Sequence, residues 1–311
     1  MAVPFVSFLV RRLAAALAVI VGASALTFVT FRVLRPESFD DTHSMPVALL
    51  EFLGRVFLHF DLGRSRMPGN REVSDIVVEA LPADVSLLAG ALVIGTVAGL
   101  AGGAVTAMRP RSPLSRSLDA LATLAVCAPV YWVGLMSLYL FAPDIGSLPL
   151  PFVGGQGTYR PLTEDPVSWL RGLVLPWLVL AAPLAGMCMR MMRVSMHDAL
   201  SQDFTRTALG KGLRWSTVVR RHAVPAGASP VISLAGVTMA TVVANAILIE
   251  RTFNIPGVLR LSTRAMGAVE DAGIVDYELL QGIVITGALL VVAANLVADT
   301  LLGWLDPRIR E

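Results

Sequence analysis

The stretch from Asp203 to Pro225, DFTRTALGKGLRWSTVVRRHAVP, is strongly basic and lies between two apolar runs that are each long enough to cross a bilayer. Apart from Asp203 and His222, its polar side chains are cations and hydroxyls, interrupted by glycines and a tryptophan. Such a set is suited to binding a partner rather than to breaking a covalent bond. A hydrophobic protein that carries so specific a polar element on one side of the membrane is expected to transmit a signal or a force there.

The spacing of small and apolar residues predicts how this segment folds. One helical face, at i, i+3, i+4 and i+7, is expected over residues 195–211. Its members are Phe204, Thr207, Ala208 and Lys211, and Arg206 lies on another face. Gly212 then ends the helix, because glycine adopts a left-handed backbone readily. A second short helix over residues 213–222 leaves at a steep angle, and Pro225 closes it. The prediction is a compact helical hairpin that exposes Trp215 and several cations for docking.

Two other interpretations of this segment remain open. A basic loop retained only for membrane topology needs cations, but it does not need the glycine and proline at these positions. A DNA-binding helix-turn-helix is disfavoured, because a unit tethered between two membrane spans has little freedom to enter a groove. Docking of a partner protein is therefore the favoured interpretation.

Catalytic and metal-binding residue patterns are absent from the sequence. The four histidines are His43, His59, His197 and His222, and none has a cysteine or carboxylate at a metal-ligand spacing such as H-E-x-x-H. Cys127 and Cys188 lie inside apolar runs, which is typical of small buried hydrophobes rather than of a disulfide. We therefore expect no catalytic residue and no metal site, and a membrane enzyme is disfavoured.

The composition indicates an integral membrane protein. Hydrophobic residues make up 55% of the 311 residues and charged residues only 15%, and the mean hydropathy is +0.69. This is too apolar for an ordinary soluble domain. Apolar stretches of about 20 residues, the length a helix needs to cross the hydrocarbon core, give six predicted spans: 13–31, 85–108, 118–141, 173–192, 231–249 and 279–302. We predict an all-α polytopic membrane helix bundle.

The distribution of Lys and Arg predicts the orientation of these spans. With the N-terminus inside, the cytoplasmic segments hold 14 of the 25 basic residues but only 6 of the 23 acidic ones. Positive segments stay preferentially in the cytoplasm. The prediction is therefore N-in and C-in, with residues 203–225 on the cytoplasmic side.

The predicted topology divides the chain into three parts. Residues 1–34 hold the N-terminal segment and the first span. Residues 35–84 form a long extracytoplasmic loop, in which 47–60 has helical apolar spacing and 76–81 suggests a second short helix before Pro82. Residues 85–311 form the remaining transmembrane helix bundle, with a cytoplasmic loop at about 193–229. The outer segment 144–171 is rich in Gly and Pro, so we expect it to be irregular.

At this point the chain resembles the binding-protein-dependent ABC importer permeases of the oligopeptide, dipeptide and nickel class. The inner matches are Asp203, Phe204, Arg206, Thr207, Ala208, Lys211, Gly212, Leu213, His222 and Pro225. Further matches follow the family's order: Arg11-Arg12, Asp61-Leu62-Gly63-Arg64-Ser65, Leu81-Pro82, Pro129 with Trp132, Glu250 with Phe253, Pro256-Gly257, Asp276-Tyr277, Gln281-Gly282, Asn295, Asp299 and Asp306-Pro307-Arg308. Ordered matches over nearly the whole chain are far more specific than any one of them.

The resemblance implies a division of labour between subunits. A cytoplasmic ATPase, which binds ATP and magnesium, would take up the inner motif, so that the chain itself binds no cofactor. Gly210-Lys211-Gly212 lacks the upstream glycine and the following hydroxyl of a phosphate-binding loop. The implied ATPase-coupling residues are the inner matches together with Trp215. Extracytoplasmic or gating residues would be Glu250, Phe253, Pro256, Gly257, Asp276 and Tyr277.

The same resemblance implies the setting and the other partners. The chain would be a multi-pass protein of a bacterial inner or plasma membrane, surrounded by lipid and with no nucleic-acid partner. It would pair with a second homologous permease and receive an extracytoplasmic substrate-binding protein. The implied cargo is a peptide or a similar small solute.

The chain departs from the family pattern at two places, and a second class of transport protein is an alternative. The segment 34–38 lacks the usual Pro-Gly-Asp-Pro type of turn, and Leu259 stands where a glycine often follows. An ion-coupled secondary transporter is the alternative function. It usually carries ionisable groups near the centre of its spans, whereas here such groups fall near the span ends. Asn245 and Asn295 lie deeper, and we expect them to join helices by hydrogen bonds.

Overall fold

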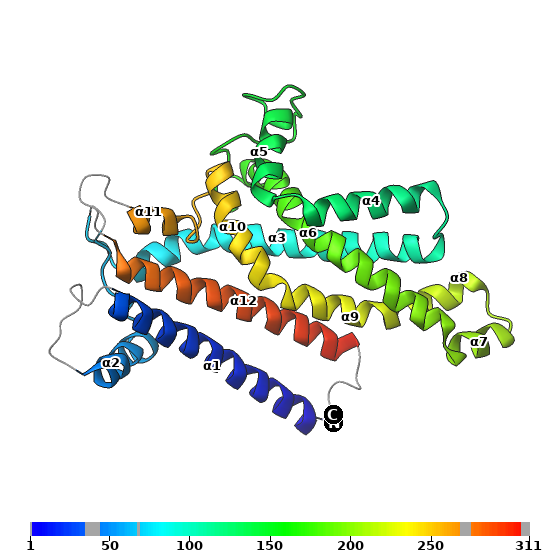
Figure 1. Cartoon of the computed structure of the whole chain (residues 1–311), viewed down its shortest axis with the longest axis horizontal. Helices are drawn as coiled ribbons and strands as arrows, with labels where there is room; N and C mark the ends of the chain where they lie inside the picture. The colour runs from blue at the N-terminus through cyan, green and yellow to red at the C-terminus, as the bar shows by residue number, and fades with distance from the viewer. Residues whose placement is uncertain (1, 35–43, 67–68, 268–274, 306–311) are drawn as a thin grey trace. The chain divides into compact units, whose positions relative to one another are not determined.

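The computed structural model describes residues 2–34, 44–66, 69–267 and 275–305, and its regular elements are helices (Figure 1). The predicted match at Asp306-Pro307-Arg308 and the atypical turn after the first span lie outside this described part. Within it there is no sheet, only one antiparallel bridge between Arg64 and Glu72. The helices are α1 Ala2–Leu34, α2 Met45–Leu58, α3 Val73–Met108, α4 Pro113–Cys127, α5 Val130–Phe141, α6 Pro166–Ser201, α7 Asp203–Gly210, α8 Trp215–Val218, the π-helical turn η2 Val219–Ala223, α9 Val224–Val237, α10 Met239–Phe253, α11 Leu261–Gly267 and α12 Tyr277–Leu305.

Among the described residues, four helices are long and apolar enough to cross a membrane. If each of two bent helix pairs is counted as one span, the number of candidate spans is six. The four are Val10–Leu34, Val73–Met108, Pro166–Ser201 and Tyr277–Gly303. The bent pairs are Pro113–Cys127 with Val130–Phe141 and Trp215–Val237 with Met239–Phe253. An all-helical membrane protein is therefore confirmed, and the six predicted spans correspond in order to these six segments.

Two of the predicted spans are not straight helices. The span predicted at 118–141 bends by 113° at Ala128 and Pro129. Ala128 is extended, as expected of a residue that precedes proline. The span predicted at 231–249 bends by 51°. There the Thr238 hydroxyl donates to the carbonyl oxygens of Leu234 and Ala235, at 2.8 and 3.1 Å, and such bonds favour a bend.

The chain forms two compact units. Unit 1 comprises Met1–Ser86 and Ile255–Ala293, and unit 2 comprises Leu87–Asn254 and Ala294–Glu311. The boundary between the two units falls within α3 and within α12, so each of these helices belongs partly to unit 1 and partly to unit 2. Each unit has its own apolar core.

The core of unit 1 joins α1 to the amphipathic helix α2. Phe28 and Phe52 stack with ring centroids 4.7 Å apart, and Ala48 and Val56 complete the buried cluster. The predicted helix at 47–60 is thus present, and its apolar face covers α1. The predicted short helix at 76–81 is wrong as a separate element, because α3 runs through Pro82. Ala83, Asp84 and Leu87, which follow Pro82 in the same helix, are buried.

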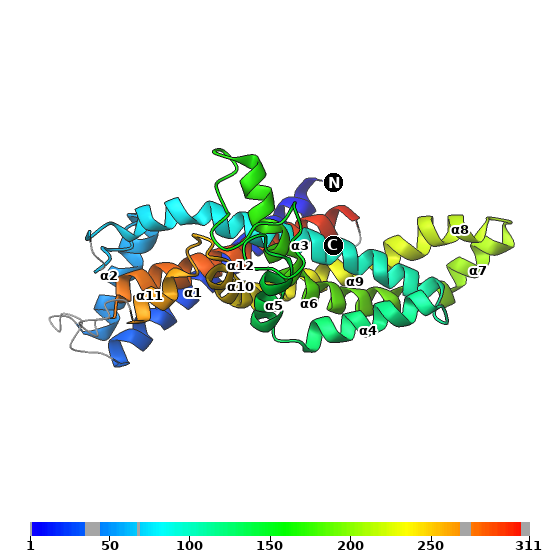
Figure 2. The same ribbon diagram turned by 90° about the horizontal axis from the view of Figure 1, so that it is seen from above.

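The core of unit 2 is centred on α6, which packs against α4 and α9 (Figures 1 and 2). Its buried members include Leu184, Cys188 and Met192 of α6 and Val231 of α9. The glycines of α3 permit a close approach to α6. A Cβ at Gly99 would collide with the Cys188 side chain and lie 3.0 Å from the Ala185 carbonyl oxygen. Residues 142–165 are irregular, and α6 begins at Pro166.

Candidate functional sites

The first half of the 203–225 segment is a short helix separated from α6. The single helix predicted over 195–211 is wrong, because α6 ends at Ser201 and Gln202 is extended before α7 begins. The Thr205 hydroxyl donates to the Ala199 carbonyl oxygen at 2.9 Å, and Thr205 is buried. This bond satisfies a carbonyl at the end of α6 without continuing its helix.

The predicted turn at Gly212 is present. Its φ is +78°, in the left-handed region, and a Cβ added there would have no heavy atom within 4 Å. Glycine is therefore required by backbone conformation rather than by packing. The Lys211 amide bonds the carbonyl oxygen of Thr207, and the Gly212 amide bonds that of Leu209, so the turn closes the C-terminus of α7.

The second half differs from the prediction at its C-terminal end. Pro225 does not close a short helix over 213–222, because α8, η2 and α9 are continuous from Trp215 onward. Proline lacks an N–H and cannot bond the carbonyl four residues earlier. The π-helical turn accommodates it: the Val224 amide bonds the Val219 carbonyl oxygen, five residues back. Pro225 thus lies in the first turn of α9.

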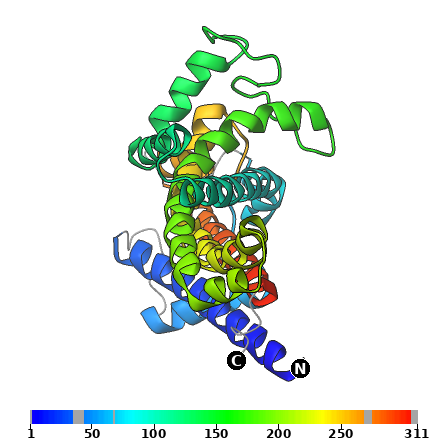
Figure 3. The ribbon, with the colours of Figure 1, turned by 90° about the vertical axis from the view of Figure 1, so that its right-hand side faces the viewer.

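The 203–225 segment combines an exposed tip with a buried base. Helices α7 and α8, at the right of Figure 1, face the viewer in Figure 3. Trp215 is 50% exposed, and Phe204, Leu209 and Leu213 are each about two-fifths exposed. The base consists of residues with little or no exposed surface, namely Thr205, Ala208, Val218, Val219 and Ala223. Val219 and Ala223 belong to the same core as Met192 and Met196 of α6. A partner that binds the tip would therefore act on a rigidly seated element.

The tip is also positively charged. Arg206 pairs with Asp203 at 3.8 Å, but both side chains are exposed. Within the described part of the chain, no ion pair neutralises Lys211, Arg214, Arg220 or Arg221. Of the predicted helical face, only Ala208 is buried, whereas Phe204, Thr207 and Lys211 are exposed. The rings of Phe204 and His222 lie 6.4 Å apart, which brings the two halves of the segment together.

In unit 1, Asp276 fastens the segment 61–66 to the start of α12. Its Oδ2 accepts hydrogen bonds from the Ser65 hydroxyl at 2.6 Å and the Arg66 amide at 2.8 Å. Its Oδ1 accepts from the Leu279 amide at 3.0 Å and so caps α12. Asp276 and Ser65 are both buried. Two sequence motifs that are 211 residues apart therefore meet in one polar contact.

Asp84 likewise holds a turn in place, the one that follows Pro256-Gly257, by accepting hydrogen bonds from its backbone amides. Its side chain is fully buried in α3 and accepts from the Val258 amide at 2.7 Å and the Leu259 amide at 3.3 Å. A carboxylate in a membrane span suggests a substrate or proton site by default. Here the two amide donors give it a structural task. We refer to residues 61–66 with Asp276, and 255–259 with Asp84, as the aspartate-held turns.

Glu250 and Phe253 are both buried near the end of α10, in unit 2. The helix ends at Asn254, whose φ of 55° is left-handed. Gln156 donates from Nε2 to the Thr252 carbonyl oxygen at 2.8 Å, and the Gly157 amide donates to that of Phe253 at 2.9 Å. The irregular 142–165 segment thereby satisfies the end of α10, which sequence reasoning did not anticipate.

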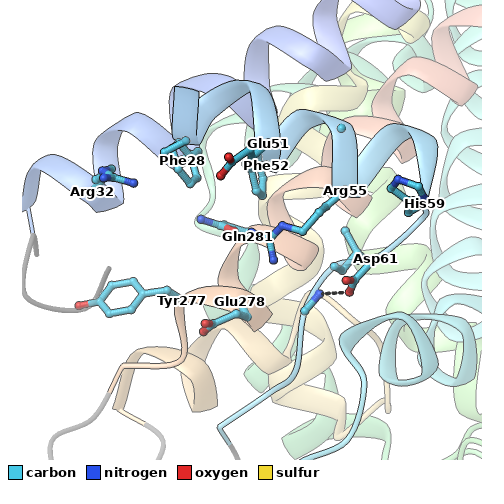
Figure 4. A pocket seen from close by; sticks show the side chains of 14 residues that line it. Phe28, Arg32, Glu51, Phe52, Arg55, His59, Asp61, Tyr277, Glu278 and Gln281 are labelled. Carbon is cyan, nitrogen blue, oxygen red and sulfur yellow. Dashed lines mark hydrogen bonds between the residues drawn. The ribbon is translucent and has the colours of Figure 1, made fainter. Parts of the chain in front are cut away.

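Unit 1 also contains a cavity of about 670 Å³ beside Tyr277 (Figure 4). It is bordered by α1, α2, residues 61–63 and the start of α12. Tyr277 is buried and packs against Phe31 with ring centroids 5.3 Å apart. Among the described residues, no group of three or more metal-ligating side chains is present in either unit.

Comparison with known proteins decides the family. Residues 95–311 match the model of the binding-protein-dependent transport system inner membrane component. The chain belongs to this family. It is therefore an inner membrane component of a transport system and crosses the membrane several times. The resemblance inferred from the ordered motifs is confirmed.

Similar proteins cover nearly the same length. A putative peptide permease protein of Brucella suis biovar 1 (strain 1330) is 34% identical over 267 residues, which are 86% of this chain and 80% of that protein. A putative peptide transport system permease protein of Brucella abortus (strain 2308) is 32% identical over 264 residues, 85% and 80% of the two chains. The oligopeptide transport system permease protein AppB of Bacillus subtilis (strain 168) is 26% identical over 97% of this chain and 99% of its own length.

In this permease chain the predicted site residues fall into three places. The inner residues gather in the 203–225 segment, which lies inside the region that matches the family model. Glu250 and Phe253 lie in unit 2, whereas Pro256, Gly257, Asp276 and Tyr277 lie in unit 1.

The hydrogen-bonding roles of Ser65, Asp84 and Gln156 were not predicted from the sequence. The DLGRS motif was the only signal that could have pointed to Ser65.

Proposed function

We propose that this chain is the permease subunit of an ATP-driven ABC importer for peptides or similar small solutes. Membership of the family supports the transport role, and the names of the similar Brucella and Bacillus proteins, which are peptide permeases, support a peptide cargo. The gradient-driven alternative has no comparable support. As a membrane subunit, the chain contributes a path for the solute and no catalytic residue.

The observation that carries this proposal is the exposed, cationic tip of the 203–225 segment on its buried base. A cytoplasmic ATPase would receive α7 and α8 in a surface cleft, with Trp215 and Leu213 as apolar anchors. Aromatic residues at the centre of an interface commonly supply much of its binding energy. The unneutralised Arg214 and Lys211 would complement an acidic rim.

Movement of the tip would pass to the spans through the shared core. Val219 and Ala223 pack with Met192 and Met196 of α6, and α6 packs along α9. Because packed interiors deform little, a tilt of α7 and α8 would displace α6 and α9 as a pair. This supports a coupling task for the inner residues predicted from the sequence, with Gly212 as the turn that sets the angle of the tip.

The remaining partners follow from the same assignment. ATP and magnesium would be bound by the ATPase, since Gly210-Lys211-Gly212 does not form a phosphate loop. A second, homologous permease would complete the path, and a substrate-binding protein would dock on the extracytoplasmic segments. In the N-in, C-in orientation predicted from the charge distribution, the 203–225 segment would lie on the other side of the membrane from those segments. Glu250, Phe253, Pro256, Gly257, Asp276 and Tyr277 remain proposed as extracytoplasmic or gating residues.

Substitution of Gly212 tests the coupling step. Proline cannot adopt the φ of +78° found there, so Gly212→Pro would redirect the tip without touching the base. We expect peptide uptake by reconstituted transporter to fall at least tenfold while ATP hydrolysis continues. Gly210→Ala is the matched control, because Gly210 is helical and has open space around its Cβ position. Coupled uptake at the parental rate by Gly212→Pro, or uptake by this chain alone in vesicles without ATP, would contradict the proposal.

A further inference from the structure

The cavity in unit 1 is lined by polar groups as well as aromatic rings. Its volume is about 670 Å³, which is within the range of small-molecule sites. Phe28 and Phe52 form part of an apolar wall. Figure 4 shows Gln281 and Glu278 on α12 facing the side of the cavity where α2 carries Glu51 and Arg55. The cavity is therefore formed by elements that are distant in sequence but belong to one unit.

Gln281 is the first sign that the cavity receives a ligand. The residue is only 6% exposed and lines the cavity. Across the ranges that the structure describes, its side-chain amide has no hydrogen-bond partner. Because the Gln281 side chain lines the cavity, a ligand there could accept a hydrogen bond from its NH₂ group and donate one to its oxygen.

Charges of both signs border the same space. Arg32 of α1 and Arg55 of α2 supply guanidinium groups, and Glu51 of α2 and Glu278 of α12 supply carboxylates. Glu278 also lies 3.5 Å from Arg66. A ligand with a single charge would meet a like charge in this cavity, whereas a ligand that carries both charges can place each beside its complement.

The position of the cavity adds a second constraint. Phe28 and Arg32 lie in the last turns of the span Val10–Leu34, and Tyr277 and Gln281 lie in the first turns of the span Tyr277–Gly303. The ends of spans coincide with the headgroup region of a bilayer, where Tyr and Arg are favoured. The site is thus within reach of lipid headgroups and of solutes in the adjoining water.

From these observations we infer that the cavity binds a small zwitterion that carries both a primary ammonium and an anionic oxygen group. Arg32 and Arg55 attract the anionic oxygens, Glu51 and Glu278 attract the ammonium, and Gln281 provides a hydrogen bond between them. Two sources share this chemistry: the headgroup of an ethanolamine phospholipid and a short free peptide. Binding at this site is separate from the coupling step and requires neither ATP nor transport.

The test uses the full chain in its transporter complex, reconstituted in nanodiscs of phosphatidylglycerol and kept free of ATP. The probes are glycerophosphoethanolamine for the lipid headgroup and dialanine for the peptide. Ethanolamine and glycerol phosphate represent the separate halves. Ligands that bind only the folded state raise the melting temperature in a concentration-dependent way. We expect at least one zwitterion to do so at concentrations where both halves have no effect, and the probe that acts identifies the source.

Two variants connect the binding to this cavity. Gln281→Leu removes the amide, and Glu51→Gln removes one negative charge from an exposed position on α2, so that folding is preserved. Each should weaken zwitterion binding at least tenfold. Gln202→Leu, the same chemical change at an exposed site in unit 2, should leave binding unchanged. No response to either zwitterion, an equal response to one of the halves, or undiminished binding by Glu51→Gln would overturn the assignment.

Discussion

The aspartate-held turns of unit 1 and the 203–225 segment of unit 2 both depend on polar residues, but they use them in opposite ways. In unit 1, Asp84 and Asp276 are buried and accept hydrogen bonds from backbone amides and a hydroxyl. In the 203–225 segment, the charged groups are exposed, and the ion pair between Arg206 and Asp203 joins side chains that are 79% and 96% exposed. Buried carboxylates fix chain positions, whereas exposed cations leave a surface open to a partner.

The buried carboxylates therefore contribute mainly to the stability of the fold, and the exposed cations mainly to association with a partner. A buried acceptor cannot be removed without leaving amide donors unsatisfied, so its loss weakens the fold. An exposed charge is already solvated, so its loss alters association more than folding. Comparable substitutions in the two regions should therefore affect different measurements: the free energy of unfolding for the buried carboxylates, and partner affinity for the exposed charges.

Removal of the Asp84 carboxylate should have the largest effect. Asp84→Ala leaves the Val258 and Leu259 amides without their acceptor inside a buried site. We expect the free energy of unfolding to fall by about 3 kcal/mol, as for the loss of hydrogen bonds to a charged group. Denaturation in mixed micelles would measure it. Asp84→Asn keeps the shape and one acceptor oxygen, so it should lose less, and equal losses for both variants would contradict this explanation.

Asp276→Ala should have the next largest effect. It removes the acceptor for the Ser65 hydroxyl and the Arg66 amide together with the cap of α12. The loss should be about 2 kcal/mol, because the segment 61–66 is partly hydrated and water can replace some of these bonds. Proteolysis should then cleave near Arg64 and Arg66 more rapidly than in the parent. Asp61→Ala, which removes only a local bond to the Gly63 amide, is the matched control.

These two turns also mark the limit of what the sequence could predict. Apolar runs predict the spans because a helix must be about 20 residues long to cross the membrane, and Gly212 predicts its turn because that backbone conformation favours glycine. The Asp84 and Asp276 contacts join residues 174 and 211 positions apart, and no local pattern encodes them. The break at Gln202 and the continuation through Pro225 depend on Thr205 and on the π-helical turn, which are likewise tertiary or cooperative features.

Thr205→Val tests a buried hydrogen bond in the base of the 203–225 segment. The change removes the hydrogen bond to the Ala199 carbonyl oxygen but preserves the volume of a buried side chain. We expect a loss of about 1 kcal/mol, smaller than either aspartate substitution because one neutral bond is involved. Thr207→Val is the control, because Thr207 is exposed and its hydroxyl bonds only within α7. A loss for Thr205→Val as large as that for Asp84→Ala would erase the distinction between the two regions.

The smallest change in stability is expected for Arg206→Gln at the tip. The Arg206 and Asp203 side chains lie 3.8 Å apart but are almost fully exposed, so the ion pair is solvated and screened by salt. The melting temperature of the purified complex should therefore match that of the parent. Affinity for the ATPase should nevertheless decrease, most clearly at low ionic strength, because the lost cation belongs to the proposed docking surface. Unchanged affinity at every salt concentration would mean that Arg206 faces away from the partner, and it would restrict the docking surface to the side of the tip that carries Trp215 and Lys211.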